Sequence, residues 1–333
     1  MVTECENIFQ FLWFRFILFQ HNADRERHAG ICKRCWRKPA VEAFLQGFFF
    51  MHEPFFFLHI PRTAGTTLNS ILKNAFPPEA ILSIYNKDEY EKNRYQSLEF
   101  LKSITLIIGH LLLENTNPPT FYGMPVRVFT FLREPIARLA SEYDFLRSWE
   151  ANHLYAFINE NNVSFREYIR SKERRLFYRG KNFMTRCISG RNFMDEPYPK
   201  EALEYAKETL EKSFTFFGIQ ERFFESLVML ADILGLDNIL HEKRNALKED
   251  ARTCLDEEDI ALARQTNVAD IALYEFALEL FDKRIAALGP VFQEKIQKLA
   301  IVNEQYQKVS HLLMQRAEQS EQGHILLPKD GMW

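Results

Sequence analysis

The sequence predicts an α/β fold, with a central and mostly parallel sheet that helices cover on both faces. Short, continuously apolar runs recur along the chain, and amphipathic helical patterns follow them. Continuous rather than alternating apolar character is typical of parallel strands, because both faces of such strands are buried. These runs span residues 55–58, 104–108, 126–132 and 214–218, and a shorter strand is expected at 81–85. No internal repeat is found, so the pattern indicates one large domain.

The composition excludes some classes of function. The chain has 333 residues, of which 47% are hydrophobic, and this is enough for one large core. Its formal net charge of −3 argues against a general nucleic-acid-binding protein, although a local basic pocket for an anion remains compatible with it. The five cysteines are an odd number at irregular spacing, so a disulfide scaffold is not expected and a reducing, cytoplasmic location is.

The first apolar run leads into a short loop and then a helix. Leu68, Ile71, Leu72 and Ala75 follow the helical spacing i, i+3, i+4, i+7. A strand that enters a helix through a tight turn directs backbone N–H groups and the positive helix end at one point. The candidate anion-binding residues of this loop are Pro61, Arg62, Thr63, Ala64, Gly65, Thr66 and Thr67.

These loop residues suit an anion by their chemistry. The threonines add hydroxyl donors, Arg62 adds a positive charge, and Gly65 lets a ligand approach the backbone. The loop is not a Walker A motif, which requires G-x-x-x-x-G-K-[ST]. On spacing alone, threonine and glycine here could equally serve only to cap the helix.

Polar residues also follow the next two long strands. Gly109-His110 ends the run at 104–108, and the carboxyl ends of strands are where open α/β sheets bind ligands. A histidine with an ordinary pKa near 6.5 can accept a hydroxyl proton, although it could also simply bond to the backbone at a strand end. Arg133 ends the run at 126–132, and Arg138 and Ser141 share one face of the helix that begins near Pro135. A guanidinium group and a hydroxyl can together bind a terminal phosphate.

Two of these segments resemble motifs of one enzyme family. His59-Ile60-Pro61-Arg62-Thr63-Ala64-Gly65-Thr66-Thr67 resembles the 5′-phosphosulfate loop of sulfotransferases that use 3′-phosphoadenosine 5′-phosphosulfate (PAPS). Leu132–Tyr143 is similar to the 3′-phosphate motif of that family, L-R-[DE]-P-x-x-R-x-x-S-x-[YF]. The resemblance covers about residues 55–285 and is closest to the branch of the heparan sulfate 2-O- and 6-O-sulfotransferases and their bacterial relatives. The chain departs from that branch at Arg62, where the first motif has lysine.

The resemblance implies a P-loop-like nucleotide-binding fold, PAPS as co-substrate, no metal, and sulfuryl transfer to an acceptor hydroxyl on a carbohydrate. It implies Arg62 and His110 as the catalytic cation and base, with Arg133, Arg138 and Ser141 at the 3′-phosphate. Asn182-x-x-Thr185-Arg186-x-x-x-Gly190 resembles a further family segment near the nucleotide, so Thr185 and Arg186 are added to the expected site. The acceptor-binding loops carry no pattern that identifies the acceptor.

Two other functions remain open at this point. A nucleoside or sugar kinase would need a divergent phosphate loop, and both a GK[ST] signature and a clear Walker B acid are missing. A non-catalytic relative that binds nucleotide or glycan is the other alternative, because arginine replaces the lysine of the motif.

The ends of the chain differ from its centre. We expect an N-terminal extension at 1–50, a sulfotransferase domain at 51–289, an amphipathic helix at 290–318 and a polar tail at 319–333. The apolar stretch at 8–19 is too short and too charged to be a convincing membrane anchor, although a Golgi location would follow from an unrecognised one in a eukaryotic source. Cys32 and Cys35 lack a second ligand pair for zinc. The heptad-like apolar positions of the last helix predict packing on the body or a coiled-coil homodimer.

Overall fold

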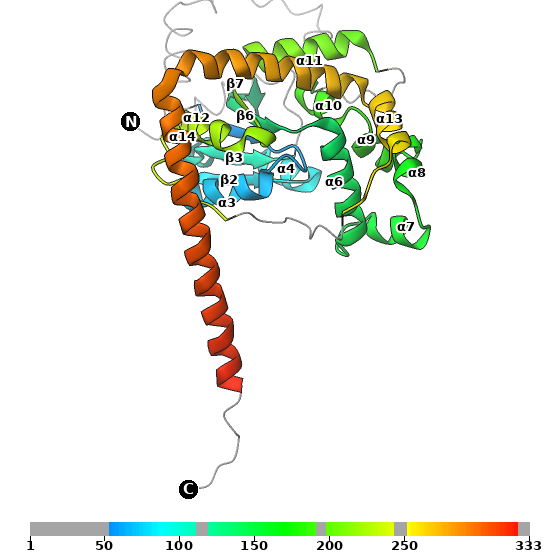
Figure 1. Cartoon of the computed structure of the whole chain (residues 1–333). Helices are drawn as coiled ribbons and strands as arrows, with labels where there is room; N and C mark the ends of the chain where they lie inside the picture. Colours follow the sequence, from blue (N-terminus) through cyan, green and yellow to red (C-terminus); the bar gives the residue numbers. More distant parts are fainter. Residues whose placement is uncertain (1–52, 111–118, 191–197, 243–251, 326–333) are drawn as a thin grey trace, which may run out of the picture. The chain divides into compact units, whose positions relative to one another are not determined.

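The computed structural model describes residues 53–110, 119–190, 198–242 and 252–325. The N-terminal extension and the Cys32/Cys35 pair lie outside the described residues. Five parallel strands form the central sheet in the order β2-β3-β1-β6-β7, which confirms the predicted parallel sheet (Figure 1). The strands are β1 (Phe55–Leu58), β2 (Ile81–Ile84), β3 (Leu106–Gly109), β6 (Arg127–Leu132) and β7 (Phe214–Ile219).

Helices cover both faces of this sheet, as the continuous apolar runs predict. The helices are α3 (Gly65–Ala75), α4 (Lys87–Asn93), α5 (Leu98–Ser103), α6 (Pro135–Ser148), α7 (Tyr155–Glu160), α8 (Phe165–Arg170), α9 (Arg174–Gly180), α10 (Phe183–Ser189), α11 (Lys200–Lys212), α12 (Phe223–Leu234), α13 (Glu257–Thr266) and α14 (Val268–Ile325). Short 3₁₀ turns span Pro78–Ala80 and Gln220–Arg222, and β4 (Thr120–Phe121) and β5 (Met124–Pro125) form a small hairpin that the sequence did not predict.

The two faces of β1 enter different apolar clusters. Phe57 packs in a cluster with α3 and α12, whereas Phe56 and Leu58 pack in a larger cluster with α10, α11 and α14. All three side chains are essentially buried. Helices α6 to α9 and α13 form a third apolar cluster of their own. The strand that carries the anion-binding loop is therefore held rigidly from both sides.

The direction in which successive strands are added to the sheet reverses between β1 and β6, and this makes the boundary between these two strands a switch point. From β1 the chain runs outward to β2 and returns to β3, and it then crosses to β6 and β7 on the other side of β1. Ligands of open α/β sheets bind at the carboxyl ends of strands where the order reverses in this way. The loops that leave β1 and β6 are therefore brought to one crevice.

α10 and α14 begin with a reciprocal cap. The side-chain oxygen of Asn182 accepts hydrogen bonds from the backbone N–H groups of Ala269 and Asp270, at 3.0 and 3.2 Å. In return, Asp270 Oδ1 accepts from the N–H and the hydroxyl of Thr185, at 2.8 and 2.7 Å. These bonds satisfy the first N–H groups of both helices. The segment 182–185 thus fastens α10 to the start of α14.

α14 consists of two helical segments that meet at Gly289, next to the predicted start of the final helix at residue 290. It begins at Val268, bends at Gly289, where φ is 71° and ψ is −172°, and continues past the expected end at residue 318. α11 packs beside its first part (Figure 1). Among the described residues, no helix is both long and apolar enough to span a bilayer.

Candidate active site

The loop after β1 turns sharply at the carboxyl edge of the sheet. Arg62 and Ala64 both adopt positive φ, 70° and 67°, and this conformation costs roughly 1–2 kcal/mol for a residue other than glycine. The Thr63 hydroxyl donates to the carbonyl of Ile60 at 2.8 Å and closes the turn. α3 then begins at Gly65 without a side-chain cap. Backbone strain at a helix N-terminus is typical of a loop shaped to bind an anion.

Two residues of this loop act differently from the prediction. Thr63 is fully buried, and its hydroxyl proton is used inside the loop rather than by a ligand. Gly65 makes room for a side chain instead of a ligand, because a Cβ there would lie 1.7 Å from Nε2 of His59. Of the predicted hydroxyl donors, Thr66 is exposed and Thr67 is half-buried. The loop can still offer backbone N–H groups and the Thr67 hydroxyl.

Arg62 connects the loop to the helix after β6. Its Nε donates to the hydroxyl of Ser141 on α6 at 3.0 Å, and Nη1 of Arg133 donates to the Arg62 carbonyl at 3.1 Å. The Arg62 guanidinium also lies over the Phe145 ring, 4.9 Å from its centroid. The two predicted phosphate-binding corners therefore meet, with Arg62, Arg133 and Ser141 between them.

Positive charge is concentrated at this meeting point. Burial lowers the pKa of Arg62, and the nearby Arg138 lowers it further, while Glu142 and Asp144 oppose the shift. Burial likewise lowers the pKa of Arg133, and Arg62 and Arg138 add to the effect against Glu221. Like-charged groups held close together in a poorly hydrated place favour a multiply charged anion as their neighbour.

Arg138 lies behind this site rather than on its surface. Its side chain is 1% exposed, and Nη2 donates to the carbonyl of Arg179 at 2.8 Å. Within the part of the chain that the structure describes, its Nε and Nη1 have no hydrogen-bond partner. The predicted contact of Arg138 with a phosphate is therefore replaced by an interior charge that acts on the site at a distance.

Parallel pairing places His110 beside a second histidine. The register pairs Leu58 with Gly109, so the residues that follow them, His59 and His110, lie next to each other. Nδ1 of His59 and Nε2 of His110 are 3.0 Å apart. The ring of Tyr85, which follows β2, contacts His110 edge-on with centroids 4.8 Å apart.

His110 keeps the neutral form that a base requires. Removal of water by the surrounding protein lowers its pKa to about 4, the charge of Arg179 adds to this, and Glu142 opposes it. His110 is nevertheless an exposed residue. Arg179 itself donates to Glu142 Oε1 at 2.6 Å, and this carboxylate is 1% exposed. The sequence did not identify the Arg179–Glu142 ion pair, because Glu142 occupies an unspecified position of the 3′-phosphate motif and Arg179 lies on a helix without a recognised motif.

Thr185 and Arg186 lie in the interior, contrary to the prediction. Thr185 is fully buried and bonded to Asp270, and Arg186 is 1% exposed with Nε donating to the carbonyl of Lys181 at 2.9 Å. The segment that resembles a nucleotide-binding region therefore forms the reciprocal cap between α10 and α14 in this structure.

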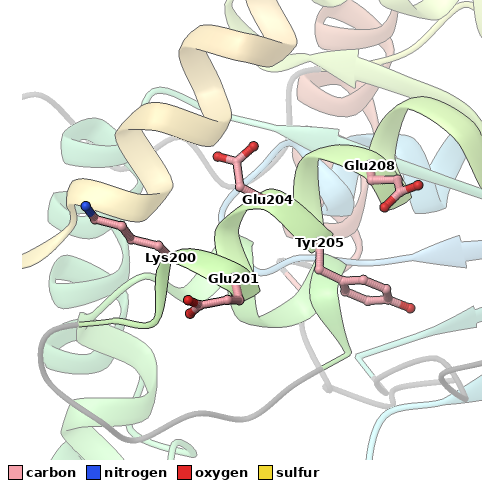
Figure 2. Close-up of a pocket in the computed structure, with 5 residues that line it drawn as sticks. All are labelled: Lys200, Glu201, Glu204, Tyr205 and Glu208. Carbon is pink, nitrogen blue, oxygen red and sulfur yellow. The ribbon is translucent and has the colours of Figure 1, made fainter.

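A surface hollow on α11 is a poor site for a nucleotide. Figure 2 shows its lining residues, Lys200, Glu201, Glu204, Tyr205 and Glu208. Three carboxylates against one ammonium group would repel an anion with several charges. The convergence of arginines around Arg62 is therefore the better candidate.

Comparison with known proteins gives one family. A model of the galactose-3-O-sulfotransferase family matches residues 51–319. No curated protein matches the chain. Among solved structures, mouse sulfotransferase SULT7A1 complexed with PAP is similar at 14% identity and a TM-score of 0.30, covering 69% of this chain and 71% of that one. This structural likeness is too weak to carry an argument, whereas the family match spans most of the chain. The family match supports a sulfotransferase, but it does not support the heparan sulfate branch that the motifs suggested.

We expect Ser141→Ala to weaken binding of 3′-phosphoadenosine 5′-phosphate (PAP) about tenfold and Arg133→Gln to weaken it more. A hydrogen bond to a charged group contributes about 1.5–3 kcal/mol. Adenosine 5′-phosphate, which lacks the 3′-phosphate, should bind both variants as it binds the wild type. Isothermal titration calorimetry with both nucleotides measures the difference.

Thr185→Val is the matched control. It removes a hydroxyl that Asp270 already holds, so it should lower the melting temperature and leave PAP affinity unchanged. Equal losses for PAP and adenosine 5′-phosphate in the Ser141 variant would show that this hydroxyl does not recognise a 3′-phosphate.

Proposed function

The chain belongs to the galactose-3-O-sulfotransferase family, and from this premise we propose that the crevice between the β1 and β6 corners binds PAPS for transfer to a carbohydrate. The enzyme is a PAPS-dependent O-sulfotransferase, and the family match favours this function over the kinase alternative. Assignment of individual residues to this reaction is our proposal.

One observation carries the assignment of the site. The 3.0 Å hydrogen bond between Arg62 and Ser141 brings the proposed phosphosulfate loop and the proposed 3′-phosphate helix within one side-chain length of each other. The two ends of PAPS carry separate anionic groups, so a site for it needs two cationic corners. Arg62 and Arg133 supply the cations, and the strained loop and the start of α3 supply backbone N–H groups.

His110 and Arg62 have distinct roles in the proposed reaction. His110 takes the proton of the acceptor hydroxyl, since its ring is neutral at physiological pH and the residue is exposed. PAPS supplies the sulfuryl group. Arg62 neutralises the charge that develops on the departing phosphate, and it cannot donate a proton there because guanidinium holds its protons too strongly.

We propose a galactose unit with a free 3-hydroxyl as the acceptor. The family description supports this choice, and so does an exposed aromatic surface beside the site. Trp149, at the end of α6, is 51% exposed and packs against Phe145 with ring centroids 5.0 Å apart. Phe145 in turn lies under the guanidinium of Arg62. The apolar face of a sugar can pack on such a ring while its hydroxyls remain free to react.

Trp149→Ala should raise the KM for a galactoside acceptor about fivefold to tenfold and leave the KM for PAPS unchanged, because a packed aromatic contact contributes about 0.5–1.5 kcal/mol. A transfer assay with labelled PAPS and a panel of galactosides measures both constants. Tyr95→Ala, which removes another exposed aromatic, is the control. A 3-O-methyl galactoside should accept no label. Equal labelling of that compound would overturn the proposed regiospecificity, and labelling of heparan sulfate alone would favour the branch suggested by the motifs.

Arg62→Lys should raise kcat severalfold over the natural protein. A lysine ammonium can both neutralise and protonate a departing phosphate oxygen, whereas arginine can only neutralise it. Single-turnover kinetics with a saturating acceptor separate this step from product release. A kcat that is unchanged or lower in the lysine variant would show that Arg62 is adapted to its place, for example through its bond to Ser141.

We propose that a second copy of the chain packs on the outer part of α14. The inner part meets the body, where Asn303 Oδ1 accepts from the N–H of His241 at 2.8 Å. On the exposed side of the helix, from the level of this contact outward, a stripe of apolar side chains continues the heptad spacing, namely Val302, Tyr306, Val309 and Leu313. A second copy carries the same stripe, and two such stripes complement each other in a coiled coil.

The double variant Val302→Glu/Val309→Glu should convert a dimer to a monomer at micromolar concentration, because four carboxylates would meet in the seam. Size-exclusion chromatography with light scattering measures the mass. Gln315→Glu, on another face of the helix, should remain dimeric. A wild-type mass of one chain at the highest soluble concentration would contradict the dimer.

We also propose a cytoplasmic location. Cys187 is buried and Cys254 is exposed, and both thiols are free. Free thiols are the usual state of cysteine in a reducing compartment.

A further inference from the structure

His59 lies beside the proposed base and takes no part in the reaction described above. It follows β1 directly, and its backbone N–H donates to the carbonyl of Gly109 at 2.8 Å, which continues the β1–β3 ladder by one step. Its ring stacks on Phe57 with centroids 5.3 Å apart and occupies the space that a side chain at Gly65 would fill. The imidazole is therefore fixed in both position and orientation.

The atoms in contact restrict how the two histidines can share protons. Nε2 of His110 faces Nδ1 of His59 at 3.0 Å, and one of these nitrogens must carry the hydrogen between them. If His59 carried it, the neutral His110 would be protonated at Nδ1 and could not accept a proton there. If His110 carries it, Nδ1 of His110 is unprotonated and can act as a base.

We propose that His59 is a positioning residue that holds His110 in the second arrangement, as a neutral hydrogen-bond acceptor for Nε2–H. This inference rests on the proposed function, since it assumes that His110 is the base. The proton of the acceptor hydroxyl moves to Nδ1 of His110 as the hydroxyl oxygen forms its bond to sulfur. The bond from sulfur to the phosphate oxygen breaks, and its electron pair stays on that oxygen. His59 gains no proton and receives a stronger hydrogen bond from the imidazolium.

The surroundings of His59 keep its imidazole neutral, as a hydrogen-bond acceptor in the pair must be. Burial lowers its pKa to about 3, and the charges of His110 and Arg62 lower it further. Around the pair, Arg179 on α9 repels a proton on His110 and Glu142 on α6 attracts one. On the far side is Tyr85, whose hydroxyl accepts from Nδ2 of Asn69 and whose backbone N–H donates to Glu89. Near the two histidines, the positive charges of Arg62 and Arg179 outweigh the negative charge of the buried Glu142 in their effect on the histidine pKa values.

The activity should persist to a lower pH than it would if the base were a histidine with an ordinary pKa. Protonated His110 cannot act as a base, so kcat/KM should fall as the pH drops through its pKa. For the free enzyme we expect that acidic limb near pH 4 rather than pH 6.5.

His59→Phe and His59→Asn test the proposal. Phenylalanine keeps the ring packing and removes the acceptor atom, so kcat should fall about tenfold to a hundredfold while PAP affinity and the KM for PAPS stay within twofold. Asparagine places an oxygen close to the position of Nδ1, and it should recover most of the lost kcat. A phenylalanine variant with wild-type kcat, or one that loses PAP affinity in proportion to kcat, would overturn the proposal and indicate a purely structural histidine.

Nitrogen-15 NMR of the imidazoles gives a readout that does not depend on turnover. In the wild-type protein at neutral pH, His110 should be protonated at Nε2 and bare at Nδ1, and the phenylalanine variant should show a mixture of tautomers. A wild-type His110 protonated at Nδ1 would refute the role of His59. If the tautomer is as expected and yet no acceptor is sulfated, the proposed function fails instead.

Discussion

The site depends on how β1 is paired, with β3 on one side and β6 on the other. The register aligns Leu58 with Gly109 and with Thr130, so β1 and β3 end at the same level, while β6 continues beside β7 to Leu132. The Thr130 hydroxyl donates to the Leu58 carbonyl at 2.8 Å and satisfies that group where the strand ends. A shift of one residue in either pairing would separate the histidines or move Arg62 away from α6.

The rigid sheet supports a site that is itself unfavourable in isolation. Two residues other than glycine adopt positive φ in the loop, and the half-buried Arg62 and Arg133 are close enough for positive charge to lower the pKa of each. Each of these features opposes folding, and each would be relieved by an anion that neutralises the cations and bonds to the backbone. The buried apolar clusters on both faces of the sheet offset this cost. The apolar clusters on the two faces of the sheet therefore provide the stability, and the loops at its carboxyl edge provide the site.

Much of this arrangement is predictable from the sequence, and the errors have a common cause. The parallel strands follow from continuous apolar runs, and the candidates Arg62, His110, Arg133 and Ser141 follow from their places at strand ends and on one helix face. Thr185 was misassigned because a hydroxyl that caps a neighbouring helix looks the same in sequence as one that binds a ligand. His59 is part of the first motif and follows a strand just as His110 does, and this shared position is the signal in the sequence that indicates a role for it.

The sequence by itself determined the strand–loop–helix units and the types of side chain at their ends, because periodicity and turn chemistry act over a few neighbouring residues. Only the tertiary structure decided which of the polar groups are available to a substrate. Thr185 and Arg138 are bonded to groups far along the chain and Thr63 is buried within its own loop, whereas Arg62 and Ser141 meet across the crevice. Hydrogen-bond partners and burial depend on residues that are distant in sequence, and no local pattern encodes them.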